Sequence, residues 1–202
     1  MLYRLPSAEQ QALSALVTRR EELLQMKLAE QNRLEHHISR PVRASIKSMV
    51  DACKQQIKSI EKSLTALIRQ SPELAHKNQL LQSLIGVGDV TARTLMATLP
   101  ELGALSKGQA ASLTGLAPYN RDSGKTNQVR HIVAGRFAAR RCLYMVATVA
   151  IAKNPVLRTK FQQLTQNGKP YKVALVAIMR KMIIILNAIL KTNQPWEYAK
   201  KT

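Results

Sequence analysis

The sequence predicts an all-α protein, and three observations support this class. Hydrophobic residues make up 46% of the 202 residues but aromatic residues only 4%, so any core is built mainly from aliphatic side chains. The alternation of β-branched and aromatic residues that marks strands is scarce. Residues that favour helices dominate the composition. We expect a long helical hairpin or coiled coil over residues 1–72 and a compact helical domain over residues 73–202.

Two long helices are predicted in the first part of the chain. Ser7 can cap the first one, with Gln10 in the position of a capping-box partner. This helix is expected to continue to about Ser39. A second helix follows Pro41 and extends to about Gln70.

The second helix carries a heptad pattern of apolar residues, which recur at alternating steps of four and three. They are Ile46, Val50, Cys53, Ile57, Ile60, Leu64 and Leu67. Such a seam is typical of a coiled coil. It can be covered by the first helix in an antiparallel hairpin or by a second copy of the chain. The length of the hairpin favours self-association, and we expect a homo-oligomer.

Residues 84–92, with the sequence LIGVGDVTA, match a helix-hairpin-helix turn. They follow a short helix expected from Glu73 to Ser83. Gly86 and Gly88 allow a tight turn and close backbone approach, and the free N–H groups of the next helix can bind a DNA phosphate. A plain corner between two core helices needs the same glycines, but the charge of the chain favours the DNA interpretation.

Four further helices complete the prediction. A short one over residues 107–114 begins after Ser106 and ends at Gly115. The other three span residues 136–153, 155–167 and 170–192, and proline or glycine separates them.

The net charge of +19 is distributed unevenly along the chain. Residues 1–102 contain 14 basic and 10 acidic residues, whereas residues 103–202 contain 17 basic and 2 acidic ones. Such an excess predicts a polyanionic partner, and nucleic acid is the usual one. A membrane surface is the rival, but it requires aromatic anchors, and Trp196 is the only tryptophan.

The most apolar stretch, residues 173–190, is predicted to be a core helix. Arg180, Lys181 and Asn187 interrupt it, which argues against a membrane span. We therefore expect no membrane partner and a cytoplasmic, nucleoid-associated protein.

Residues 117–135 form the longest polar stretch without helical or strand periodicity, and we call them the polar segment. Ser123 lies beside Gly124, among the basic residues Arg121, Lys125 and Arg130. A serine on a sharp turn can attack a phosphodiester while neighbouring cations stabilise the added charge. On composition alone, the stronger interpretation of Asp-Ser-Gly is an ordinary turn.

Other basic residues are predicted to bind DNA phosphates. Arg136 and Arg140 lie four apart on one predicted helix face, for which a solvated face is the alternative. Lys169 and Lys172 extend the basic surface with contacts that do not depend on DNA sequence.

No metal site is expected in this chain. Two-metal phosphoryl transfer needs converging carboxylates, and residues 103–202 contain only Asp122 and Glu197. Cys53 and Cys142 show no metal-ligand spacing and are expected to be reduced thiols.

Several motifs taken together resemble the transposase domain of the IS110/IS116/IS902 family. They are residues 84–88, 99–103, 111–125, 135–136, 140–145, 168–175 and 179–181. The resemblance covers about residues 80–192, and the predicted hairpin resembles the coiled-coil segment of the family. It implies DNA transposition or site-specific recombination, with Ser123 as the DNA nucleophile and a structured guide RNA as a further partner.

Members of this family also carry an N-terminal RuvC-like nuclease domain with an Asp-Glu-Asp-Asp metal set. The resemblance therefore implies Mg²⁺ only for that domain, which residues 1–202 do not include, and no cofactor for this chain. We expect an incomplete transposase that supplies DNA binding and the serine. The alternative is a non-catalytic, truncated module that dimerises and binds DNA or RNA.

Overall fold

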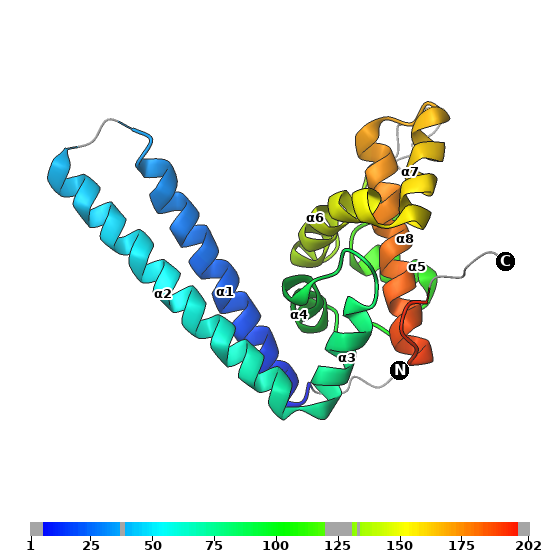
Figure 1. The fold of residues 1–202 in the computed structure, drawn as a ribbon, viewed down its shortest axis with the longest axis horizontal. Coiled ribbons are helices and arrows are strands. Elements are labelled where there is room, and N and C mark those ends of the chain that lie inside the picture. The colour runs from blue at the N-terminus through cyan, green and yellow to red at the C-terminus, as the bar shows by residue number, and fades with distance from the viewer. Residues whose placement is uncertain (1–5, 37–38, 120–130, 133, 198–202) are drawn as a thin grey trace. The chain divides into compact units, whose positions relative to one another are not determined.

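The computed structural model describes residues 6–36, 39–119, 131–132 and 134–197 (Figure 1). These residues form eight helices and one pair of two-residue strands, which confirms the predicted all-α class. Two compact units are present, Met1–Ala75 and His76–Thr202.

The first unit is a hairpin of two long helices, α1 (Ala8–Arg33) and α2 (Arg40–Gln70), which pack along each other (Figure 1). The hydroxyl of Ser7 caps α1 and accepts a hydrogen bond from the Gln10 backbone N–H at 3.1 Å. The predicted first helix is therefore present, but it ends at Arg33 instead of continuing to Ser39.

The apolar seam of α2 is buried against α1 within the hairpin. The buried residues of α2 are Ile46, Val50, Cys53, Ile57, Leu64 and Ile68. Leu13 and Leu23 are the buried residues of α1. Of the predicted seam positions, Ile60 and Leu67 are half-buried, and Ile68 takes the place of Leu67 in the core. The first helix thus covers the seam in a single chain.

The second unit is built around α8 (Tyr171–Thr192), which packs against α5 (Lys107–Leu113), α6 (Phe137–Lys153) and α7 (Pro155–Gln166). The helix α4 (Asp89–Thr98) packs on α6, and α3 (Pro72–Gln82) leads into it from α2. The length and composition of α8 would also suit a membrane span, and no other helix in the described part of the chain passes that test. Here its buried residues contact other helices, as predicted for a core helix.

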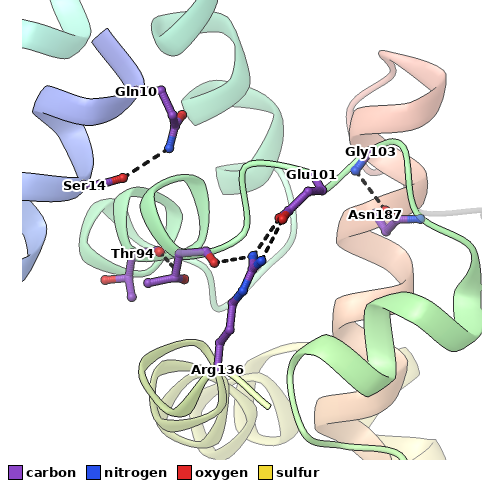
Figure 2. A network of polar contacts seen from close by, with 8 residues as sticks. Gln10, Ser14, Thr94, Glu101, Gly103, Arg136 and Asn187 are labelled. Atoms are coloured by element: carbon purple, nitrogen blue, oxygen red, sulfur yellow. Dashed lines mark hydrogen bonds and ion pairs between the residues drawn. The ribbon is translucent and has the colours of Figure 1, made fainter. Parts of the chain in front are cut away.

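A buried amide explains the polar residue in this apolar helix. The side chain of Asn187 accepts a hydrogen bond from the Gly103 backbone N–H at 2.8 Å (Figure 2). It also donates one to the Leu105 carbonyl oxygen, at 2.8 Å. Buried polar groups cost free energy unless they are paired. Asn187 therefore attaches the connection between α4 and α5 to α8.

Candidate nucleic-acid interface

The two ends of the polar segment are joined by backbone contacts. The strands β1 (Pro118–Tyr119) and β2 (His131–Ile132) pair in antiparallel register, with Pro118 opposite Ile132. Beyond the strands, the Arg136 backbone N–H donates a hydrogen bond to the Leu113 carbonyl oxygen at 2.7 Å. The residues on either side of the segment are therefore held next to each other.

Two glycines make this approach possible. Gly115 and Gly135 have φ values of +66° and +78°, in the left-handed region that side chains disfavour. A Cβ atom on Gly135 would overlap the backbone of Gly115, and one on Gly115 would overlap the Ala134 carbonyl oxygen. Neither position has room for a side chain, so the two segments touch through their backbones. We call this contact of Gly115 with Gly135 the junction.

Arg136, at the N-cap of α6, connects this junction to α4. Its guanidinium binds the Glu101 carboxylate through two hydrogen bonds of 2.6 Å and donates another of 2.6 Å to the Thr98 carbonyl oxygen (Figure 2). Hydrogen bonding from Arg136 lowers the pKa of Glu101, although partial burial opposes the shift. Hydrogen bonding to Glu101 raises the pKa of Arg136. The pair therefore favours the charged form of both side chains.

Arg140 lies one turn further along α6 and also contacts the junction. Its guanidinium donates a hydrogen bond of 2.7 Å to the Ala134 carbonyl oxygen and lies 5.8 Å from the ring centroid of Phe137. Arg136 and Arg140, both predicted to bind phosphates, thus contact protein groups beside the polar segment.

The predicted helix-hairpin-helix glycines lie between α3 and α4 and differ in their surroundings. Gly86 has a φ of +104°, and a Cβ there would come within 3.1 Å of the Ala150 Cβ, so this glycine permits close packing on α6. Gly88 is the N-cap of α4 and borders open space. Next to it, Asp89 places a carboxylate in the first turn of α4. There its negative charge interacts favourably with the helix dipole, and the same charge repels a DNA phosphate.

The two predicted lysines lie at the corner between α7 and α8. Lys169 follows α7 and Lys172 lies in the first turn of α8, and both are exposed. Beside them, the rings of Phe161 and Tyr171 meet edge to face with centroids 5.3 Å apart.

Comparison with known proteins identifies the part of the chain that contains the junction. Residues 78–162 match the family model described as "Transposase IS116/IS110/IS902 family". This segment is similar to transposases of that family, and we call residues 78–162 the transposase domain after this match.

Relatives of known name extend the similarity beyond the transposase domain. The pilin gene-inverting protein of Moraxella bovis is 27% identical over 189 residues, which cover 92% of this chain and 58% of that protein. The "Insertion element IS110 uncharacterized 43.6 kDa protein" of Streptomyces coelicolor is 27% identical over 76% of this chain and 37% of its own length. An IS900 insertion element protein of Mycobacterium paratuberculosis is 31% identical over 61% of this chain and 32% of its own length. The chain thus spans little more than half of the first relative.

The predicted nucleophile of the transposase domain, Ser123, lies outside the described residues, as do Arg121, Lys125 and Arg130. Within the described part of the chain, the domain joins Gly115, Gly135, Arg136 and Arg140 at one place. Neither Glu101 nor Thr98, which bind Arg136 there, was predicted as a site residue.

The described residues of the chain include no group of three or more His, Cys, Asp or Glu side chains that could hold a metal ion. Burial raises the pKa of the Cys142 thiol to about 12, so the thiol stays protonated at neutral pH.

Proposed function

We propose that this chain acts in DNA recombination as the DNA-binding and serine-bearing part of an IS110-type transposase. The family match over residues 78–162 carries this proposal, because it includes the whole polar segment and the residues at both of its ends. The name of the Moraxella relatives describes inversion of a gene, which is a rearrangement of DNA.

In the proposed reaction, the Ser123 hydroxyl gives up its proton and its oxygen attacks a phosphorus atom of the DNA backbone. An ester between serine and phosphate forms as the bond from phosphorus to a deoxyribose oxygen breaks, and that oxygen takes up a proton. The hydroxyl of another DNA end then attacks the ester, which joins the strands and restores the serine. The number of phosphodiester bonds is unchanged.

The junction beside the polar segment supports this proposal. Functional loops depend on a rigid scaffold that limits the positions of their side chains. The contact of Gly115 with Gly135 and the attachment of Arg136 to Glu101 provide such a scaffold on either side of Ser123.

The remaining parts of the proposal rest on the resemblance to the family. A RuvC-like domain would supply the carboxylates and Mg²⁺ for DNA cleavage. A structured RNA would guide target choice. The length of the α1–α2 hairpin, and not the resemblance, is the reason to propose that a second copy of the chain associates through α1 and α2.

Replacement of Ser123 by Ala tests the proposed nucleophile. We expect strand exchange, measured with the RuvC-like domain supplied, to be abolished while DNA binding is retained. Ser48→Ala is the matched control, because Ser48 is exposed on α2 in the other unit. Strand exchange that survives in Ser123→Ala would overturn the assignment.

A second candidate function is a binding and assembly module without catalysis, and the charge of residues 103–202 favours it. Binding dominated by phosphate contacts must weaken steeply with salt. Lys169→Ala and Lys172→Ala should each reduce the slope of log affinity against log salt by about 1. Affinity that does not change with salt would argue against this function.

A further inference from the structure

One face of α6 exposes large apolar side chains to solvent. Phe137 and Met145 are 64% and 63% exposed, and Tyr144 and Val149 are both 42% exposed. The opposite face is buried in the transposase domain and contains Ala139, Leu143, Val146, Ala147 and Ala150. The exposed residues recur at helical spacing, so they line one side of α6 instead of being scattered over the surface.

Packing of the fold does not account for the aromatic residues on this face. The chain contains only two phenylalanines and five tyrosines, and one residue of each type lies exposed here. Burial of an aromatic ring stabilises a fold, and an exposed ring does not provide this stabilisation. A contiguous exposed apolar patch indicates a binding surface.

The charges around this face favour a nucleic acid as the ligand. Arg141 lies exposed between Phe137 and Tyr144, and the guanidinium of Arg140 lies near the Phe137 ring. Among the described residues between Glu101 and Glu197, none is acidic. Aromatic rings with arginines between them are typical of surfaces that stack bases and bind the phosphates that connect them.

We propose that Phe137 and Tyr144 stack on unpaired bases of single-stranded DNA. Bases of a duplex already stack on their neighbours, so only unpaired bases offer free faces to these rings. The two residues are seven positions apart, which is about 10.5 Å along a helix, so each ring serves a different base. The inference rests on the proposed DNA function and adds that the transposase domain holds DNA strands after their pairing is lost.

A comparison of two DNA probes separates base stacking from phosphate binding. The full chain is titrated with single-stranded oligothymidylate and with a strand of equal length that lacks all bases. We expect the strand with bases to bind at least about tenfold more tightly, because each stacked base contributes about fivefold or more in affinity and two rings take part.

The double variant Phe137→Leu with Tyr144→Leu should remove this preference and leave the affinity for the abasic strand unchanged. Leucine keeps an apolar side chain at each position but has no ring. The double variant Phe137→Trp with Tyr144→Trp should retain the preference. Thermal unfolding followed by circular dichroism checks that all variants are folded, and a preference that survives both leucines would overturn the inference.

Met145→Ala with Val149→Ala is the matched control, because these residues lie on the same exposed face and have no ring. An equal loss of preference in this control would show a general apolar contact and overturn the inference. A single-stranded RNA probe whose affinity depends more strongly on the two rings would overturn DNA as the ligand. If neither strand binds, the proposed DNA function fails, whereas equal binding of the two strands refutes only the stacking.

Discussion

At the scale of single residues, the contact of Gly115 with Gly135 makes a strong prediction about stability. Each glycine has a positive φ and no room for a Cβ atom. We expect Gly115→Ala and Gly135→Ala to lower the free energy of unfolding by about 2–5 kcal/mol each, because backbone strain of about 1–2 kcal/mol adds to overpacking of about 1–3 kcal/mol. Urea unfolding of the full chain measures this loss.

Two other glycines separate the contributions of strain and overlap. Gly168 has a φ of +77° but nothing near its Cβ position, so Gly168→Ala should cost about 1–2 kcal/mol from strain alone. Gly88 has a φ of −101° and open space, so Gly88→Ala should cost less than about 1 kcal/mol. Equal effects at all four positions would contradict the role of backbone overlap.

The Glu101–Arg136 pair predicts a pH-dependent difference between wild type and Glu101→Gln. The pKa of Glu101 is lowered in the folded state, so its contribution is complete above the ordinary value of 4.5 and is lost as pH falls through the lowered value. At neutral pH we expect the variant to be less stable by about 1 kcal/mol, because the pair is partly exposed to solvent. Urea unfolding across this pH range measures the difference, which should disappear in acid.

Asp51→Asn is the control for this experiment. Asp51 and Lys54 form an ion pair of similar length, 2.9 Å, but both side chains are more than half exposed. Its loss should change stability by only a few tenths of a kcal/mol, about the value of an exposed helical pair. A Glu101→Gln variant that behaves in the same way would show that the pair contributes little to the fold.

Single residues also show where prediction from sequence ends. The spacing of Arg136 and Arg140, four apart on one helix face, predicts phosphate contacts, but the Arg136 guanidinium binds Glu101, which is 35 positions away in the sequence. Only the fold brings the two together. The pairing of Gly115 with Gly135 is likewise a contact between distant segments that no local pattern reveals.

At the scale of elements, local patterns predicted the helices well. The caps Ser7 and Ser106 hold the first turns of α1 and α5 as expected, because a cap and its partners lie within four residues. The end of α1 was predicted too late. The chain must reverse its direction before Ser39, the N-cap of α2. The apolar periodicity continues beyond Arg33, so it does not predict where α1 ends.

The buried side chain of Asn187 attaches α8 to the chain between α4 and α5. Asn187→Leu would leave the Gly103 N–H and the Leu105 carbonyl without their partner. A fully buried polar group without a partner costs about 1–3 kcal/mol. Because both bonds are only partly buried, we expect the two losses together to be about 2–4 kcal/mol in thermal or urea unfolding. Ala188→Gln, on the exposed side of the same helix, should be nearly neutral. A stable Asn187→Leu variant would show that the α4–α5 connection is held by other contacts.

At the scale of the whole molecule, each of the two units has its own apolar core. Leu64 is buried in the α1–α2 hairpin and Leu143 in the transposase domain. Leucine-to-alanine changes in a core cost about 2–5 kcal/mol. We expect Leu64→Ala to increase amide hydrogen exchange mainly in residues 8–70 and Leu143→Ala mainly in residues 89–192, as measured by mass spectrometry. Equal loss of protection throughout the chain in both variants would show that the units unfold as one.

The junction of Gly115 with Gly135 has a consequence for how such a domain can diversify. Because the join is made by backbone atoms, the side chains between the two glycines are not needed to form it. The cost of closing a loop also grows slowly with its length, by about 0.6 kcal/mol for each doubling. The segment between Gly115 and Gly135 can therefore be replaced by one of different sequence or length while the helical scaffold keeps its stability.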